Sequence, residues 1–280
     1  MQVAITGGSG KLGKWVVRHF LDQGYDVRNI DQRFPEYVEG QDLYVDLNNL
    51  GEVYGALEGC DAVVHTAAIP VAYRYPNEVT FSNNTLSTYN VLEAASSLGI
   101  EKAVISSSES SYGLVFAVNP FEPLYVPMDE DHPQLVQDSY GLSKIVNEET
   151  ADMFHRRTSI QVVSFRLGNV IDPEGYKQFP SWLHDPQQRA QILWSYIDAR
   201  DAAAAMELAI QADGLGSIAL NLANNETSMD ISSAELMQKA YPDVEIREEL
   251  GEYQTLLDNR RAKETLGWQP AHRWRDEVGS

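Results

Sequence analysis

Short apolar runs alternate with segments of helical character along the first 167 residues. Residues 14–23 repeat apolar side chains at helical spacing, and we also expect helices over 84–98 and 140–158. An alternation of strands and helices specifies an α/β fold, a doubly wound parallel sheet of the Rossmann type, and ligands gather at the carboxyl ends of its strands. The predicted strands cover residues 2–5, 25–30, 43–45, 62–65, 102–106 and 161–167.

Beyond residue 167 the elements become shorter and more mixed. We expect a helix over 198–211, a strand over 218–222 and a further element over 232–240. The proline-containing stretch 118–138 predicts an irregular crossing before the helix at 140. The sequence therefore predicts a dinucleotide-binding domain over residues 1–167. Residues 168–280 are expected to form a small C-terminal substrate-binding lobe, interleaved with the end of the sheet.

A glycine-rich turn joins the first strand to the first helix. Gly7, Gly10 and Gly13 stand in Thr6-Gly-Gly-Ser-Gly-Lys-Leu-Gly13, which is the strand–turn–helix context of a dinucleotide site. Glycine lets the backbone approach a pyrophosphate closely, and the helix N-terminus offers unpaired N–H groups to it. We expect the intervening Ser9, Lys11 and Leu12 to contact the cofactor as well.

An acidic residue ends the second strand. Asp31 is placed to accept hydrogen bonds from the adenosine ribose hydroxyls and would repel a 2′-phosphate, which favours NAD over NADP. Arg33 leaves NADP open. At the end of the third strand, Asp46 and Leu47 are expected near the adenine. After the fourth strand, the small residues Ala67 and Ala68 would let the cofactor lie against the protein backbone.

Tyr140 and Lys144 are four residues apart on a predicted helix and therefore share a face. A positive charge ~5 Å from a phenol, at an effective dielectric of ~20, favours the phenolate by ~3 kcal/mol, or roughly two pKa units. Such a tyrosine can exchange a proton with an alcohol at neutral pH. Ser108, in the serine-rich end of the predicted fifth strand, would face the same ligand edge.

The composition narrows the classes of partner. The net charge of −20 disfavours nucleic acid and anionic membranes as partners. Only seven of the 21 basic residues are lysine, which is typical of a salt-adapted surface but equally of an ordinary acidic enzyme. The single cysteine, Cys60, and six scattered histidines predict neither disulfides nor a metal site. The first strand follows Met1 directly, so we expect no signal peptide and a cytoplasmic protein.

The order and spacing of several motifs together resemble one family, the extended short-chain dehydrogenases/reductases, also called the NAD-dependent epimerase/dehydratase family. The motifs are Thr6-Gly-x-x-Gly-x-x-Gly13, Asp31, Asp46-Leu47, His65-x-Ala-Ala68, Asn84, Ser106-Ser-Ser-x-x-x-Tyr-Gly113, Tyr140-x-x-x-Lys144, Arg166-Leu-Gly-Asn169, Tyr196-Ile-Asp and Leu266-Gly-Trp268.

The resemblance implies roles for individual residues. Tyr140 would be the general acid/base, Lys144 would lower its pKa and hold the nicotinamide ribose, and Ser108 would hydrogen-bond the reacting oxygen. Asn84 would support the lysine or the cofactor, although a helix N-cap is an equal alternative. Leu167 and Val170, after the sixth strand, would also contact the cofactor. The resemblance further implies a homodimer, formed through the helices over 84–98 and 140–158.

Departures from the family patterns restrict the reaction. Sugar-nucleotide dehydratases carry Thr-Asp-Glu where this chain has Ser108-Glu109-Ser110, so we reject a dehydratase. The epimerases usually have a longer insert after Asn169 and place a diphosphate-binding arginine where this chain has Trp194, which would leave an aromatic pocket wall. Arg189 could replace that arginine, whereas Arg166 looks internal and Arg200 begins a helix.

The short form and the Leu-Gly-Trp ending resemble the uronate and aldose 1-dehydrogenases. We therefore expect an NAD-dependent enzyme that oxidises the C1 hydroxyl of a free aldose or uronate to a lactone. A 4-epimerase of reduced size is the alternative, and a cofactor-sensing regulator is a third reading. The predicted substrate contacts are Ser108, Glu109, Ser110, Asn169 and Tyr73. Tyr73 would belong to a lid over the sugar, and a surface loop without a role is the alternative. His65 could touch the substrate or could be a hydrogen-bonded core residue.

Overall fold

The structure is a computed structural model that describes residues 1–34 and 41–278. At its centre lies a seven-stranded sheet whose strands all run parallel, in the order β10-β7-β5-β4-β1-β2-β3. The predicted α/β, doubly wound fold is confirmed. The strands are β1 (Gln2–Thr6), β2 (Asp26–Asp31), β3 (Gln41–Tyr44), β4 (Ala62–His65), β5 (Lys102–Ser108), β7 (Gln161–Leu167) and β10 (Ser217–Leu222).

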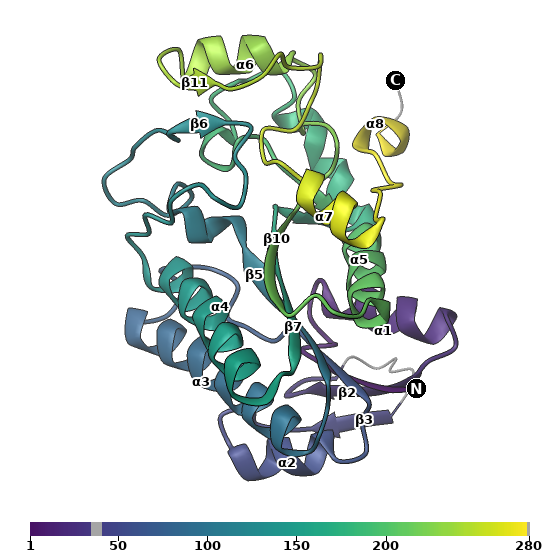
Figure 1. Cartoon of the computed structure of the whole chain (residues 1–280). Helices are drawn as coiled ribbons and strands as arrows, with labels where there is room; N and C mark the ends of the chain where they lie inside the picture. Colours follow the sequence, from purple (N-terminus) through teal and green to yellow (C-terminus); the bar gives the residue numbers. More distant parts are fainter. Residues whose placement is uncertain (35–40, 279–280) are drawn as a thin grey trace.

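Helices cover both faces of the sheet (Figure 1). On one face lie α2 (Leu50–Leu57), α3 (Asn77–Ser97) and α4 (Ser139–Thr158), and on the other lie α1 (Gly13–Asp22) and α5 (Ala199–Gln211). This arrangement buries the strands on both sides, which explains why they read as nearly continuous apolar runs.

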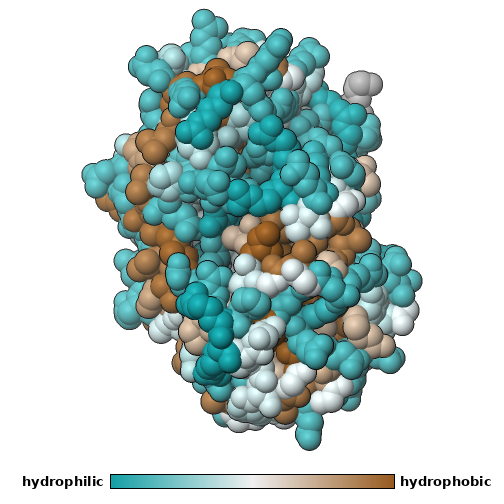
Figure 2. All heavy atoms as spheres, viewed as in Figure 1, coloured by the Kyte–Doolittle hydropathy of each residue, from teal (hydrophilic) through white to brown (hydrophobic). Residues whose placement is uncertain are grey.

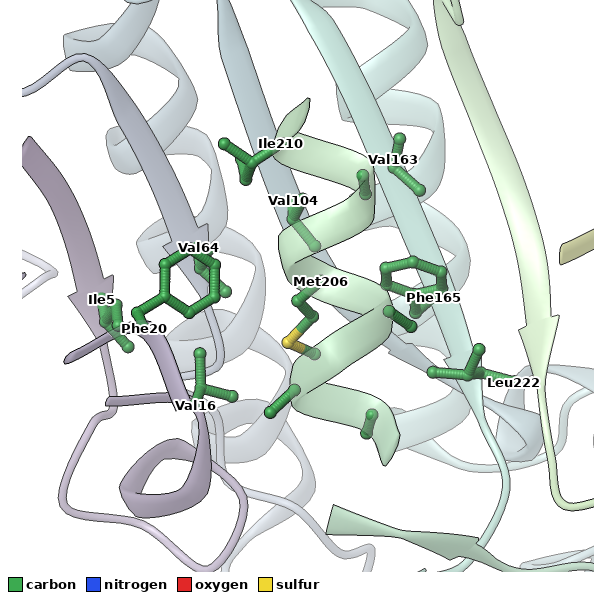
Figure 3. Close-up of a cluster of buried hydrophobic side chains, with 14 of the residues drawn as sticks. Ile5, Val16, Phe20, Val64, Val104, Val163, Phe165, Met206, Ile210 and Leu222 are labelled. Atoms are coloured by element: carbon green, nitrogen blue, oxygen red, sulfur yellow. The ribbon is translucent and has the colours of Figure 1, made fainter. Parts of the chain in front are cut away.

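The core beneath α5 shows how distant segments combine. Met206 and Ile210 of α5 point toward Val104, Val163 and other side chains of the central strands, and Val16 and Phe20 of α1 complete the cluster (Figure 3). Because α5 lies after residue 167 and packs on strands before it, the two halves of the chain share one core.

A smaller unit stands above the carboxyl end of the sheet (Figure 1). It contains a buried apolar cluster that includes Trp194, Leu236 and Leu257. Its strands pair as β6 (Tyr125–Val126) with β11 (Glu245–Ile246) and as β8 (Val170–Ile171) with β9 (Ile197–Asp198). Its helical segments are η1 (Glu109–Tyr112), η2 (Pro173–Ser181), η3 (Ala190–Ile192), α6 (Ser233–Ala240) and α8 (Trp274–Glu277), while α7 (Arg260–Leu266) packs near β10.

Several predicted boundaries differ from the structure, most of them by one or two residues. Helix α3 begins at Asn77 rather than near Asn84, because its buried face carries Thr80, Asn84 and Ser87, so that no apolar period marks the first two turns. Asn84 is therefore inside the helix, and its reading as an N-cap is wrong. Strand β3 ends at Tyr44 rather than Val45. The sequence reading also missed α2, although its apolar residues include Val53 and Leu57.

The surface seen in Figure 2 is mostly hydrophilic, with hydrophobic residues near the middle of this face and along its left edge. Within residues 1–34 and 41–278, no helix combines the length and the apolar character that crossing a bilayer requires.

Candidate active site

Two adjoining cavities lie at the carboxyl ends of the strands. The first, about 380 Å³, extends from the end of β2 toward α3. The second, about 400 Å³, lies between the glycine turn, the end of β5 and the start of α4. Both are lined by Gly7, Gly10, Thr66, Ala68 and Pro70, so they form one continuous groove across the sheet edge.

The glycine turn forms the floor of this groove. Gly7 has a φ of +71°, and a Cβ at this position would lie 2.6 Å from the Ala67 nitrogen. A Cβ at Gly13 would lie 2.0 Å from the Gly7 carbonyl oxygen. No other residue fits these two positions without a collision, so glycine allows the turn to pack closely on the segment after β4 and on itself. The compact turn that results fits the approach of a pyrophosphate.

Asp31 lies at one end of the groove. Its carboxylate accepts hydrogen bonds from the backbone N–H groups of Ser9 (3.0 Å), Gln32 (2.7 Å) and Arg33 (3.2 Å). Asp31, Arg33 and Leu47 line the first cavity, as predicted for the adenosine end of a dinucleotide. Ser9 and Asp46 do not line it; Asp46 instead accepts hydrogen bonds from Asn48 and Gln32.

The three residues predicted to be catalytic line the second cavity together. Ser108 ends β5, and its Oγ accepts a hydrogen bond from the Ser110 N–H at 3.1 Å. Tyr140 lies in the first turn of α4, which Asp138 caps by accepting from the Gly141 N–H at 2.7 Å. The Lys144 Nζ donates to the Ser106 carbonyl at 2.7 Å and lies 5.5 Å from the centre of the Tyr140 ring.

The pKa of Tyr140 is raised in this structure, whereas the spacing to Lys144 predicted that it would be lowered. Burial raises the pKa of Tyr140 to about 12, against the lowering effect of the Ser108 hydroxyl, and nearby Glu109 raises it further. Burial also lowers the pKa of Lys144 to about 8, with Glu148 acting in the opposite direction. Lys144 is not among the groups that shift the pKa of Tyr140, and its amine donates to the Ser106 carbonyl.

The predicted substrate contacts only partly reach the cavity. Glu109, Ser110 and Asn169 line it, with Val115 and Phe116. Tyr73 does not line it.

Tyr73 instead lies behind Phe116, donating its hydroxyl to the Phe116 carbonyl at 2.9 Å. Phe116 packs edge-on against both Tyr73 and Tyr140, with ring centres 6.3 and 5.9 Å apart. The sequence reading missed Phe116, and only its position shortly after Tyr112-Gly113 could have indicated it.

One of the three arginines considered for the substrate side lies next to the site. Arg166 pairs with Glu148 at 2.7 Å and Arg200 with Asp198 at 2.8 Å. Arg189 lies beside the site, and its Nη1 donates to the Asn169 side chain at 3.1 Å.

Trp194, expected to form an aromatic pocket wall, is fully buried and packs against Tyr241. The aromatic residue of the wall is Phe116 instead.

Asn84 lies behind the groove rather than in it. It accepts from the Ile69 N–H at 2.8 Å and donates to the Ile69 carbonyl at 3.0 Å and to the Ser143 hydroxyl at 3.3 Å. It therefore ties the segment after β4 to α4.

His65 is a buried core residue and does not contact the cavity, which agrees with the alternative interpretation of this residue. Its ring bonds to Thr6 at 2.7 Å and Thr88 at 3.0 Å, and burial lowers its pKa to about 3.

The remaining predicted cofactor residues surround the groove. Ala67 lines the first cavity, Ala68 lines both, and Lys11, Leu12, Leu167 and Val170 line the second. The Lys11 Nζ donates to the Val170 carbonyl at 2.6 Å, joining the glycine turn to β8. In the part of the chain that the structure describes, no group of three or more His, Cys, Asp or Glu side chains is placed to hold a metal ion.

A comparison with protein families agrees with this geometry. Residues 3–223 match the NAD dependent epimerase/dehydratase family. The chain belongs to this family. The resemblance inferred from the motifs is confirmed, and the protein is an enzyme of the extended short-chain dehydrogenase/reductase class.

Relatives in this family have different activities. The chain is 28% identical over 236 residues to an NAD-dependent glucose-6-phosphate dehydrogenase of Haloferax volcanii, covering 80% of this chain and 86% of the relative. It is 31% identical to a putative UDP-glucose 4-epimerase of Methanocaldococcus jannaschii, over 70% of this chain but 62% of the relative. It is 26% identical to a uronate dehydrogenase of Pseudomonas syringae, over 65% and 64%.

A solved structure confirms the fold. A short-chain dehydrogenase/reductase superfamily protein from Agrobacterium tumefaciens with bound NAD superposes with a TM-score of 0.76 at 23% identity, over 99% of this chain and 95% of that one.

Proposed function

We propose that the enzyme is an NAD-dependent dehydrogenase that oxidises the C1 hydroxyl of a small sugar, a free aldose or uronate, to a lactone. The observation that carries this proposal is the position of Ser108 and Tyr140 in a cavity that continues the groove of the glycine turn. A sugar in that cavity would meet a hydroxyl pair beside the cofactor groove.

In this proposal the Ser108 hydroxyl and the Tyr140 phenol hydrogen-bond the C1 oxygen. As the phenolate, Tyr140 would accept the C1 hydroxyl proton while C1 loses its hydrogen as hydride to the cofactor and the C1–O bond becomes a carbonyl. NAD, when bound, supplies the hydride acceptor and a positive ring charge that favours the phenolate. The glycine turn and Asp31 would hold its pyrophosphate and ribose, and Lys144 would hold the ribose nearest the reaction.

The size of the second cavity supports a small substrate. About 400 Å³ must accommodate both the nicotinamide end of the cofactor and the substrate. The position expected to grip a diphosphate holds Trp194, which is fully buried. The uronate dehydrogenase and glucose-6-phosphate dehydrogenase relatives also support oxidation of a monosaccharide, and the latter adds a sugar phosphate to the substrates to be tested.

A UDP-sugar 4-epimerase is the second candidate. It is supported by the epimerase relative at 31% identity. Such an enzyme would oxidise and re-reduce its substrate without net turnover of cofactor. A cofactor-sensing regulator has less support, because a sensor does not need Ser108, Tyr140 and Lys144 together.

A substrate panel separates these functions. Purified protein is incubated with NAD and with free aldoses, uronates, sugar phosphates and UDP-hexoses, and NADH is followed by absorbance. We expect NADH with aldoses or uronates, none with UDP-hexoses, and loss of cofactor on gel filtration. UDP-hexose interconversion with retained cofactor and no net NADH would contradict the proposal, and NAD binding without any turnover would favour the regulator.

Several further properties belong to this proposal. We propose NAD rather than NADP as the working cofactor because of Asp31. We also propose a cytoplasmic location and a homodimer. We further propose the division into a dinucleotide-binding domain over 1–167 and a substrate lobe over 168–280 that is interleaved with the sheet, to which its residues contribute α5 and β10. The lobe stands over the carboxyl end of the sheet, where it would cover a sugar bound next to Tyr140 (Figure 1).

A further inference from the structure

Glu109 is a buried carboxyl group in the wall of the reaction cavity. It follows Ser108 directly and is the first residue of η1. Its side chain is only 7% exposed, and it lines the same cavity as Ser108, Tyr140 and Lys144. The mechanism described above does not use it.

The protein satisfies only part of the hydrogen-bonding capacity of Glu109. The Ser195 hydroxyl donates to its Oε2, and the Asn169 backbone N–H is a second donor. A carboxylate has about four acceptor sites on its two oxygens. Because Glu109 also lines the cavity, its remaining acceptor sites are available to a hydroxyl group of a sugar bound beside Tyr140.

Arg189, which does not line the cavity, balances the negative charge of ionised Glu109. Arg189 interacts with it electrostatically, but its guanidinium donates to the Ser228 hydroxyl (2.9 Å), the Asn169 side chain (3.1 Å) and the Ser195 carbonyl (2.8 Å). Arg189 is not among the residues that line the cavity. Its positive charge therefore serves the buried network and not an anion in the cavity.

The cations that do line the cavity have other partners. Among the described residues these are Lys11 and Lys144, which donate to the carbonyls of Val170 and Ser106. Lys11 belongs to the glycine turn, and Lys144 lies beside the Tyr140 ring. Neither lysine hydrogen-bonds Glu109, so a substrate carboxylate in this space would meet another carboxyl group.

We propose that Glu109 is a specificity-determining residue that hydrogen-bonds a hydroxyl of the sugar and, when ionised, disfavours sugars that carry a carboxylate. The proposal rests on the proposed dehydrogenase function and narrows its substrates. It predicts a preference for neutral aldoses over uronates that strengthens as Glu109 loses its proton.

The range of pH in which this preference changes follows from the groups around Glu109. Burial raises its pKa to about 8, with Ser195, Arg189 and the Asn169 N–H acting in the opposite direction. Tyr140 and Lys144 face the same cavity, and Lys144 has a lowered pKa of about 8. A change in Lys144 acts on the shared C1 chemistry, so it affects both kinds of sugar and largely cancels in their ratio.

The test compares sugars that differ only at C6. The ratio of kcat/KM for galactose to that for galacturonate, and likewise for glucose to glucuronate, is measured from pH 6.5 to pH 9.5. A repulsion between two like charges about 6 Å apart, at an effective dielectric of about 20, weakens binding by up to about a hundredfold, and incomplete ionisation of Glu109 within this pH range reduces the observable change. We therefore expect the wild-type ratio to rise roughly tenfold across this range.

Glu109→Gln should abolish the rise, because an amide keeps the hydrogen bonds but has no charge to gain. Glu130→Gln is the matched control: Glu130 is a buried carboxyl group with a raised pKa that lies outside the cavity. It should leave the rise unchanged. NAD affinity and thermal melting show whether each variant is folded.

A wild-type ratio that stays flat, measured without any variant, overturns the inference even if Glu109→Gln fails to fold. A rise that persists in folded Glu109→Gln also overturns it, and both results leave the dehydrogenase proposal standing. If the wild-type enzyme oxidises no sugar of either kind, the proposed function itself fails and this inference falls with it.

Discussion

Tyr140 shows how the surroundings of a residue can reverse an expectation drawn from sequence spacing. The four-residue spacing to Lys144 places the two side chains together, as expected. Tyr140, however, is only 7% exposed, and burial disfavours the charged form of its phenol. The phenolate that Tyr140 needs in order to accept a proton during oxidation must therefore be stabilised by the bound reactants.

Replacing the hydroxyl of Tyr140 tests its role directly. We expect Tyr140→Phe to lower turnover by ~10²–10⁴, the range for a lost general acid/base, with little change in NAD affinity. Steady-state kinetics and fluorescence titration with NADH measure the two effects. Tyr73→Phe is the matched control, because its hydroxyl bonds the Phe116 carbonyl outside the cavity. Turnover of Tyr140→Phe within a few-fold of wild type would exclude Tyr140 from the mechanism.

At the scale of elements, α3 positions the groove from behind. Its buried face carries polar side chains, among them Asn84, Thr88 and Asn90. Thr88 bonds His65 at the end of β4, Asn84 bonds Ile69, and Asn90 donates to the Leu47 carbonyl at 2.8 Å. The helix thus fixes the segments after β3 and β4, from which Leu47, Ala67 and Ala68 line the groove.

Removing the Asn84 side chain should loosen this arrangement. Asn84→Ala leaves the partly buried N–H and carbonyl of Ile69 without their side-chain partner, at up to ~1–3 kcal/mol for each group. We expect a loss of ~2–4 kcal/mol in the free energy of unfolding, measured with urea, together with weaker NAD binding. Ser82→Ala, on the exposed face of the same helix, should change stability by less than ~0.5 kcal/mol. Equal losses in the two variants would contradict this role for Asn84.

At the scale of the whole molecule, the excess of acidic residues dominates. With 41 acidic and 21 basic residues, the folded chain concentrates a net charge of −20, which opposes the compact state by self-repulsion. Large side chains on α3 and α4, such as Leu86 and Leu142, remain 44% and 43% exposed. These would be covered in the proposed homodimer.

Screening should therefore stabilise the protein. Raising KCl from 0.05 M to 1 M shortens the screening length from more than 10 Å to about 3 Å. A gain of ~2 kcal/mol would raise the melting temperature by roughly 4–8 °C. Differential scanning calorimetry at fixed protein concentration measures this shift, with sucrose as the uncharged control solute. A melting temperature that is flat or falls with KCl would show that self-repulsion does not limit stability.

The sequence by itself determined the elements whose chemistry is local. Gly7, Asp31, Ser108 and Tyr140 could be placed at strand ends or a helix start, since a strand, a turn and a helix each leave a pattern within a few residues. Because parallel strands end at one edge, these residues could also be expected to meet, and in the structure they line one groove.

Only the tertiary structure decided what lies behind and around them. Asn84 lies inside helix α3, where it hydrogen-bonds Ile69. Tyr73 contacts Phe116 instead of lining the cavity, and Trp194 is buried away from the cavity. Tertiary packing also brought Glu109 and Arg189, 80 positions apart in the chain, into one network with Ser195. Burial and long-range contacts set these environments and their pKa values, and neither leaves a signal in the spacing of residues along the chain.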